Sequence, residues 1–186
     1  GLITYMRTDS TRISKEMQET AKDFILRNYG EDYYPSKPNV YGSKGSAQDA
    51  HEAIRPTSLE LTPKMVEPFL SRDELKLYTL IWNRFMASQM APQQNESTTI
   101  ELTVQNDYTF KATGSRVIFP GFSAVYEDVK KEDAPQLPAL KKNDAAHTVE
   151  VLPEQHFTQP PPRYSEASLI KTLEELGIGR PSTYAP

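Results

Sequence analysis

Residues 71–112 contain the clearest change of pattern in the chain and read SRDELKLYTLIWNRFMASQMAPQQNESTTIELTVQNDYTFKA. The stretch opens on Ser-Arg-Asp-Glu, the pattern of a capping box, and apolar side chains then recur at helical spacing until Pro92. From Asn95 onward, apolar and polar residues alternate with a period of two, which is typical of antiparallel strands with one apolar face. The stretch therefore predicts a long helix that ends near Met90, followed by an antiparallel β region.

The residues before this stretch favour further helices. A helix is predicted between Ser14, which can cap its start, and Gly30, which suits its end. A second helix is predicted to begin at Thr62, because proline at the next position is common in a first helical turn. Between them, residues 31–46 are rich in polar residues, proline and glycine and predict a long loop, and residues 47–53 are predicted as a short helix.

The residues after the alternating stretch predict more β structure and then helix. We expect a third extended run at residues 117–126 that is interrupted at Pro120 and Gly121, an exposed loop at 130–144 and a further strand at 147–152. A helix is predicted from a serine cap at 165 to a glycine stop at 177, and residues 179–183 prepare another helix start. The fold class predicted from these patterns is mixed α and β.

The composition excludes several classes of protein. The 186 residues include 21 Lys and Arg against 25 Asp and Glu, which gives a net charge of −4 and no overall basic footprint for nucleic acid. The chain has no cysteine, which removes disulfides, thiolate metal sites and cysteine nucleophiles. No apolar run approaches the roughly 20 residues that a membrane helix needs, and no signal peptide is recognisable. We therefore expect a cytoplasmic protein without a membrane partner.

The two ends predict a segment of a longer polypeptide. Gly1 begins inside an apolar stretch without an initiator methionine. The sequence stops at Pro186, where a new helix is about to begin.

The first candidate site lies around Tyr5 and Arg7. The two residues are two positions apart, so on an extended segment their side chains point the same way. A cation beside a phenol favours the phenolate and can stabilise charge that develops on phosphoryl oxygens, as attack on a phosphodiester requires. The alternative is a half-buried strand tyrosine beside an unrelated surface arginine, and the spacing by itself favours that alternative.

The second candidate site lies around His51. Its imidazole can donate to a phosphate or carry a proton near neutral pH. The alternative is a hydrogen-bonded structural histidine, with Glu52 and Arg55 as a surface ion pair. A zinc site is disfavoured, because no second histidine or cysteine lies at ligand spacing.

The third candidate site combines Arg163 and Ser165 with the later segment that contains Arg180, Ser182 and Thr183. Arginine and hydroxyl groups near helix N-termini can hold a phosphate, and neighbouring aromatic rings can stack on bases. The alternative is ordinary helix capping, which Ser165 is expected to perform in either case.

Three strings taken together resemble the type IA DNA topoisomerases, and within that family the bacterial topoisomerase I branch. They read GLITYMRTDST, SAQDAHEAIRPT and HFTQPPPRYSEASLIKTLEELGIGRPSTYA, in this order. Met6 follows the tyrosine at the position where the topoisomerase III branch usually has proline. The resemblance covers residues 1 to about 57 and 156 to 184, and the helix-then-strand order between them fits the family.

This resemblance implies part of a torus built from four domains. Residues 1–91 would form the helical domain with the active-site tyrosine, and residues 92–155 one half of an antiparallel β arch. Residues 156–186 would begin a helical domain that binds single-stranded DNA.

The resemblance also implies a reaction. The family cleaves one DNA strand through a 5′-phosphotyrosyl intermediate, passes another strand and religates, which relaxes negative supercoils without ATP. Tyr5 matches the nucleophile, Arg7 the residue that positions the scissile phosphate, and His51 a histidine near that phosphate. The remaining residues expected to contact DNA are Thr8, Asp9, Arg55, Arg163, Arg180, Ser182 and Thr183.

The cofactor and partners follow from the same resemblance. The family binds Mg²⁺ on a separate acidic Toprim domain upstream, so no metal ligand is predicted in these residues, and the isolated segment is expected to be inactive. The expected partners are single-stranded DNA, the rest of the parent chain and, through an exposed β edge, a second copy. The alternative function is a non-catalytic single-stranded nucleic-acid-binding module, but Tyr5, Arg7 and His51 together favour the enzyme.

Overall fold

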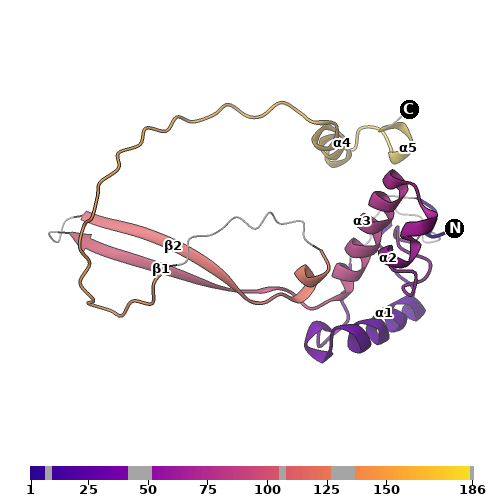
Figure 1. The fold of residues 1–186 in the computed structure, drawn as a ribbon. Helices are drawn as coiled ribbons and strands as arrows, with labels where there is room; N and C mark the ends of the chain where they lie inside the picture. Colours follow the sequence, from indigo (N-terminus) through magenta and orange to yellow (C-terminus); the bar gives the residue numbers. More distant parts are fainter. Residues whose placement is uncertain (7–9, 42–51, 105–107, 127–136, 185–186) are drawn as a thin grey trace. The chain divides into compact units, whose positions relative to one another are not determined.

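The structure is a computed structural model that describes residues 1–6, 10–41, 52–104, 108–126 and 137–184. The chain divides into two compact units, residues 1–139 and 140–186, and each is described by itself. The first unit contains helices α1 to α3 and strands β1 and β2, and the second contains α4 and α5 (Figure 1).

Helix α1 spans Lys15–Asn28, and its cap determines where it starts. The Ser14 hydroxyl accepts a hydrogen bond from the Met17 amide at 3.3 Å, which satisfies one of the unpaired donors of the first turn. Gly30 follows with φ at +98°, a conformation that glycine adopts easily, and leads into the short 3₁₀ helix η1 at Glu31–Tyr33. The predicted helix is confirmed, and η1 lies at the start of the predicted loop.

Helix α3 spans Arg72–Gln89 and confirms the helix predicted from the capping box. The Glu74 carboxylate accepts from the Ser71 amide at 2.9 Å, while the Ser71 hydroxyl accepts from the Glu74 amide at 3.4 Å. Before it lie the predicted short helix α2 at Pro63–Val66 and the 3₁₀ helix η2 at Glu67–Phe69.

The core of the first unit lies between α1, α3 and the segment that joins α1 to α2. The Phe24 and Trp82 rings meet edge to face at 5.8 Å, and the Trp82 indole donates to the Leu59 carbonyl at 3.4 Å. The buried Tyr78 donates to the Leu61 carbonyl at 2.6 Å. Burying each large apolar side chain of this kind contributes about 1.5–3 kcal/mol, so these contacts hold the two helices together.

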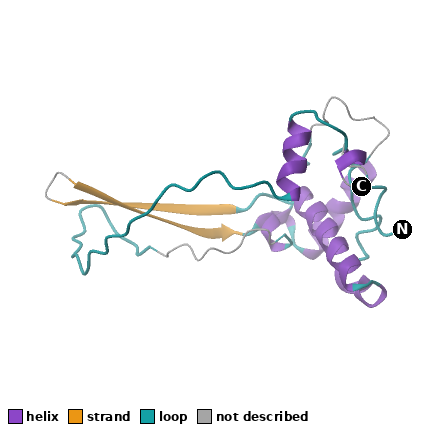
Figure 2. Cartoon of the chain, turned by 90° about the horizontal axis from the view of Figure 1, so that it is seen from above, coloured by secondary structure: helices purple, strands orange, loops and turns teal. Residues whose placement is uncertain are grey.

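The β region is a single antiparallel hairpin of β1, Gln94–Val104, and β2, Tyr108–Phe119 (Figure 2). The register pairs Ile100 with Ala112, Leu102 with Phe110 and Val104 with Tyr108, which places these apolar side chains on one face. We call this set the apolar hairpin face. Val104, Phe110 and Tyr108 remain 42%, 63% and 65% exposed, so the alternation predicted the strands although little of this face is buried.

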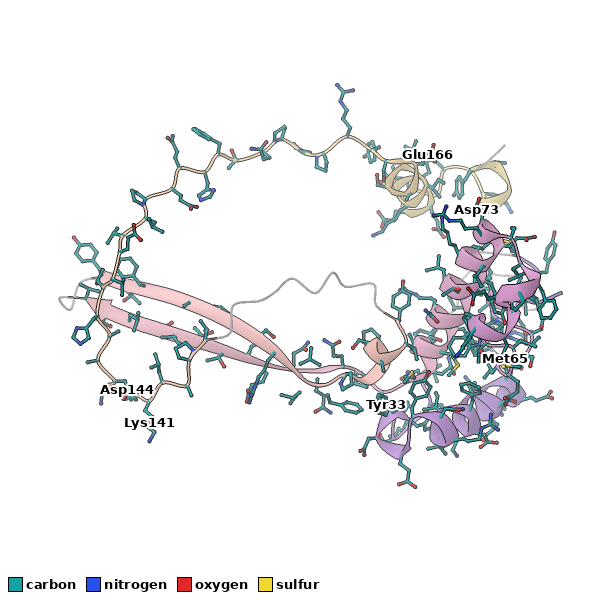
Figure 3. All side chains as sticks on the ribbon, viewed as in Figure 1. Tyr33, Met65, Asp73, Lys141, Asp144 and Glu166 are labelled. Atoms are coloured by element: carbon teal, nitrogen blue, oxygen red, sulfur yellow. The ribbon has the colours of Figure 1, made fainter. Side chains whose placement is uncertain are left out.

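The base of the hairpin is joined closely to the helical region. The rings of Tyr33 and Phe119 lie 4.9 Å apart where the hairpin meets the helices (Figure 3). Phe122 donates its amide to the Ala91 carbonyl at 2.9 Å. Gly121 has φ at +51°, and a Cβ there would lie 2.4 Å from the Pro92 carbonyl oxygen. Only glycine fits this approach, so the turn after β2 depends on it.

Two local predictions need correction, and a third falls largely outside the described residues. The extended run predicted at residues 117–126 is confirmed for residues 117–119, which end β2 at the predicted interruption. It is wrong beyond them, because the 3₁₀ helix η3, Gly121–Ala124, turns the chain back toward α3. The strand predicted at 147–152 is also wrong: these residues lack a ladder partner among the described strands, and Val149 is 98% exposed. Of the helix predicted at 47–53, residues 47–51 lie outside the described residues, and residues 52 and 53 are not helical.

The second unit confirms the two helix starts predicted near the C-terminal end. Helix α4 spans Glu166–Glu175, and the Ser165 hydroxyl accepts from the Ser168 amide at 3.2 Å. Gly177, with φ at +69°, follows its last turn, and α5 spans Pro181–Tyr184. Within the predicted loop at 130–144, residues 137–144 form no helix or strand. The three-domain division stays a prediction.

Candidate active site

Two segments far apart in the sequence are paired at the start of the first unit. Ile3 and Pro56 form an isolated antiparallel bridge. The Thr4 amide donates to the Arg55 carbonyl at 2.9 Å, and the Thr57 amide donates to the Leu2 carbonyl at 3.0 Å. The string that carries Tyr5 therefore lies beside the string that carries Arg55.

The Thr4 side chain strengthens this pairing. Its hydroxyl donates to the Ala53 carbonyl at 2.9 Å and accepts from the Arg55 amide at 3.0 Å. At the other end of the pair, the Thr57 hydroxyl donates to the Gly1 carbonyl at 3.0 Å. Hydroxyl groups can donate and accept at once, so Thr4 links its strand to two backbone positions of the opposite segment.

Tyr5 follows this pairing directly, and its side chain is 77% exposed. Its backbone is thus anchored one residue earlier, while the phenol reaches solvent. Arg7, Thr8 and Asp9 lie outside the described residues. The description resumes at Ser10, which is buried and whose hydroxyl accepts from the Arg12 amide at 3.2 Å.

Arg55 turns its guanidinium toward the protein. Its Nη2 lies 2.8 Å from the Glu52 carboxylate, and its Nη1 donates to the Pro56 carbonyl at 3.0 Å. The side chain is only 13% exposed, and its buried Nε has no hydrogen-bond partner among the described residues. The ion pair with Glu52 that the sequence suggested is present, although it is largely buried rather than on the surface. A contact between Arg55 and DNA stays a prediction.

His51 lies outside the described residues. Two positions later, Ala53 donates its amide to the Arg12 carbonyl at 2.8 Å and accepts from the Thr4 hydroxyl. The described end of the histidine string is therefore attached to the tyrosine string on both sides of Tyr5.

The candidate DNA-binding residues of the second unit are exposed where the structure describes them. Arg163 and Arg180 both lie on the surface. The Thr183 hydroxyl accepts from the Arg180 amide at 2.9 Å, so it performs local capping at the start of α5. The Ser182 side chain lies outside the described part of the chain. Ordinary capping is thus confirmed for Ser165, and phosphate contacts by these residues stay predictions.

Sequence reasoning did not single out Thr4. A threonine beside a tyrosine carries no signal by itself, because its importance comes from the pairing with residues 53–57. That pairing joins residues about 50 positions apart, as the separation of 51 between Thr4 and Arg55 illustrates.

Two further properties of the described residues concern metal binding and membrane insertion. Across the described ranges, no group of three or more histidine, aspartate or glutamate side chains is arranged to hold a metal ion. Among the same residues, no helix combines the length and apolar character needed to cross a bilayer.

The comparisons with known proteins agree with one another. A family model described as DNA topoisomerase matches residues 1–186. The DNA topoisomerase 1 of Xylella fastidiosa is 50% identical over 193 residues, which cover 100% of this chain and 24% of that protein. The DNA topoisomerase 1 of Campylobacter jejuni is 52% identical over 188 residues, covering 100% of this chain and 26% of that protein.

A solved structure is similar along almost the whole chain. The full-length topoisomerase I from Thermotoga maritima matches with a TM-score of 0.74 and 38% sequence identity. The match covers 99% of this chain and 29% of the Thermotoga chain. The present chain thus spans about a quarter of the length of the curated relatives it matches.

Proposed function

Because this chain belongs to the bacterial type IA DNA topoisomerase family, we propose that it supplies the nucleophile with which a topoisomerase cleaves one DNA strand. The Tyr5 hydroxyl gives its proton to solvent and attacks the scissile phosphorus. A bond forms between Tyr5 Oη and phosphorus, the bond from phosphorus to the 3′ oxygen breaks, and that oxygen takes up a proton. The product is a 5′-phosphotyrosyl adduct and a free 3′ hydroxyl.

The observation that carries this proposal is the combination at Tyr5 of an anchored backbone and an exposed side chain. The phenol is 77% exposed, so a phosphate of a DNA strand can approach it. The residue before it is hydrogen-bonded to Ala53 and Arg55 through its amide and its hydroxyl, so the approach occurs at a defined position. Holding a nucleophile in a fixed geometry lowers the barrier to attack, since orientation no longer has to be gained in the transition state.

The rest of the catalytic cycle follows from the bonds that are exchanged in this step. One phosphodiester bond is exchanged for one phosphotyrosyl bond, so reversal by the 3′ hydroxyl needs no ATP. Passage of another strand before religation would relax negative supercoils. We assign Arg7 to the scissile phosphate and His51 to proton transfer or phosphate contact, both from the resemblance. The reaction would take place on single-stranded DNA in the bacterial cytoplasm.

The described arginines support different roles in DNA binding. Arg163 and Arg180 are exposed, so their guanidinium groups are accessible to DNA phosphates. Arg55 would have to leave the Glu52 carboxylate at 2.8 Å, so we propose that it contacts DNA only after rearrangement. Thr8, Asp9, Ser182 and Thr183 remain proposed contacts beside the cleaved strand.

Metal chemistry is not assigned to these residues. The described part of the chain offers no set of three carboxylate or histidine ligands. From the resemblance to the family, we propose that Mg²⁺ binds elsewhere in the full-length protein, and no step above is routed through it. The 186 residues alone are expected not to cleave DNA.

The apolar hairpin face indicates a protein partner, in addition to the DNA partner proposed for the rest of the molecule. Ile100 and Leu102 are only half buried, and Tyr108 and Phe110 are largely exposed. Both strands of a two-stranded sheet also present an unpaired edge. We propose that the rest of the parent chain covers this hairpin, and that the separate 186-residue protein associates with itself through the same edge.

The test of the proposed function is covalent trapping with the full-length protein. Wild type, Tyr5→Phe and the control Tyr108→Phe are incubated with a labelled single-stranded oligonucleotide, denatured and separated, and binding is measured alongside. Tyr5→Phe should form no adduct. It should bind the oligonucleotide within about twofold of wild type, because a surface substitution changes free energies by about 0.5 kcal/mol. Tyr108 is similarly exposed, at 65%, and its substitution should leave the adduct unchanged.

The outcomes separate the two candidate functions. An adduct that persists in Tyr5→Phe would show that another residue is the nucleophile. A wild-type protein that binds the oligonucleotide but never forms an adduct would favour the single-stranded nucleic-acid-binding module.

A further inference from the structure

Thr4 has an unusual concentration of hydrogen bonds for a residue next to a candidate nucleophile. Its amide, its hydroxyl as a donor and its hydroxyl as an acceptor all bind the backbone of residues 53–55, at 2.9, 2.9 and 3.0 Å. These bonds are long-range, since they join positions separated by 49 and 51 residues. The strand before Tyr5 is therefore fixed by tertiary pairing rather than by its own local structure.

The direction of the two side chains explains why this matters. Successive side chains of an extended segment point to opposite sides. The Thr4 side chain is directed at residues 53–55, and the next side chain, Tyr5, is 77% exposed. Consecutive Cα atoms are about 3.8 Å apart, and the phenol oxygen of Tyr5 lies farther from Thr4 than the Tyr5 Cα does. A small rotation of the strand at Thr4 therefore moves this oxygen by more than it moves the Tyr5 Cα.

We propose that Thr4 is a positioning residue for Tyr5, and that its hydroxyl holds the tyrosine strand against residues 53–55 so that the phenol oxygen meets the phosphate in a productive orientation. This inference rests on the function proposed above. Thr4 does not contact the reacting atoms; it acts through the backbone. Misplacing a reacting group by about 1 Å can slow a reaction about 100-fold, so loss of this hydroxyl should affect chemistry more than binding.

The two hydroxyl groups of the same paired segments provide a matched control. Thr57 also donates from its hydroxyl to a backbone carbonyl, that of Gly1 at 3.0 Å, but at the end of the pair away from Tyr5. A purely structural role would make the loss of cleavage rate follow the loss of thermal stability in both Thr4→Val and Thr57→Val. A positioning role would make only Thr4→Val slow in cleavage. Thr4→Ser keeps the hydroxyl and should restore most of the rate.

The experiment uses the full-length protein and a labelled single-stranded oligonucleotide under single-turnover conditions. The rate constants of cleavage and religation, the oligonucleotide affinity and the thermal unfolding temperature are measured for each variant. For Thr4→Val we expect cleavage and religation to slow together by about 10–100-fold, because both directions use the same orientation of Tyr5. The affinity should stay within about threefold, and the ratio of cleaved to religated DNA should not change.

Several results would overturn the proposal. One is a Thr4→Val protein that cleaves at the wild-type rate. Another is a Thr57→Val protein that is as slow as Thr4→Val. A third is a loss of rate that only follows a loss of folded protein in the unfolding measurement. If Thr4→Val does not fold, Thr4→Ala removes the hydroxyl without a methyl group in its place and is tested against Thr4→Ser.

The failure of this inference can be distinguished from failure of the proposed function. If Tyr5→Phe abolishes the adduct and Thr4→Val is normal, only the positioning role is wrong. If Tyr5→Phe still forms the adduct, the proposed nucleophile is wrong whatever Thr4 does.

Discussion

The helical region and the hairpin of the first unit differ in how they use their apolar side chains. Helices α1 and α3 bury theirs against each other, with Ile25 and Met86 fully inaccessible to solvent. The hairpin collects its apolar residues on one face, yet Tyr108 and Phe110 on that face stay 65% and 63% exposed. Both regions have clear sequence periodicity, but among the described residues only the first completes a core.

The difference has a physical basis. A helix satisfies its backbone hydrogen bonds internally and needs only one apolar stripe to pack against a neighbour. A two-stranded hairpin leaves an unpaired edge on each strand and is only marginally stable without a further layer. Sequence periodicity therefore specifies a helix or a strand and its register, while burial of its apolar side chains depends on the surfaces that the rest of the molecule packs against it.

The difference between the two regions is tested most strongly by replacing one large side chain in each region with alanine. Trp82→Ala should lower the free energy of unfolding of the 186-residue protein by about 3–5 kcal/mol, because it removes a buried ring and leaves a cavity. Phe110→Ala should lower it by less than about 1 kcal/mol, since only cross-strand contact with Leu102 is lost. Urea denaturation followed by circular dichroism measures both. Equal losses would mean that the hairpin is as well packed as the helices.

The joint between the two regions gives a second test. Gly121→Ala should cost about 1–2 kcal/mol for its positive φ and about 1–3 kcal/mol more for contact with the Pro92 carbonyl. Gly30→Ala is the control for backbone strain alone, which costs about 1–3 kcal/mol at its φ of +98° and ψ of 171°, because a Cβ there meets no atom within 4 Å. Thermal unfolding of both variants should show the larger loss at Gly121. Similar losses would indicate that the hairpin base rearranges freely.

The smallest expected effect concerns pH. Burial raises the pKa of the Tyr78 hydroxyl, which donates to the Leu61 carbonyl. The folded state then favours the neutral phenol, so its contribution is complete below the ordinary tyrosine value of about 10 and is lost as the pH rises through the folded pKa. Tyr78→Phe should cost about 1 kcal/mol at pH 7 and make the loss of stability above about pH 10 less steep.

Urea denaturation at a series of pH values measures this effect. Tyr108→Phe is the control at pH 7, since removal of its exposed hydroxyl should leave the free energy of unfolding there unchanged. Burial also raises the pKa of Tyr29 and Tyr41, so part of the alkaline slope should remain in Tyr78→Phe. If the free energy of unfolding of Tyr78→Phe falls with pH as steeply as that of wild type, Tyr78 does not contribute to the alkaline loss of stability.

Much of the fold followed from local sequence signals. Serine caps at positions 14, 71 and 165 predicted the starts of α1, α3 and α4, because a cap acts within one turn. An interruption at Pro120 and Gly121 was predicted, but the 3₁₀ turn that follows β2 was not, since it depends on the close approach of Gly121 to Pro92. Residues 147–152 alternate like a strand but lack a ladder partner among the described residues, and alternation alone does not provide one.

The candidate site followed from the sequence less completely. Tyr5 was selected by resemblance, because the spacing of Tyr5 and Arg7 alone favoured an ordinary strand. The Glu52–Arg55 ion pair was anticipated as an alternative, but its burial was not. Thr4 was missed, because its hydrogen bonds reach a segment about 50 residues away and leave no local pattern.

The central claim, that Tyr5 is the nucleophile, is tested most directly by locating the covalent adduct. The full-length protein is trapped on a short single-stranded oligonucleotide and digested with trypsin and nuclease, and the peptides are sequenced by mass spectrometry. We expect a nucleotide 5′-phosphate on Tyr5, in the peptide that ends at Arg7. A phosphotyrosyl nucleotide on any other tyrosine, such as the exposed Tyr164, with Tyr5 unmodified, would contradict it.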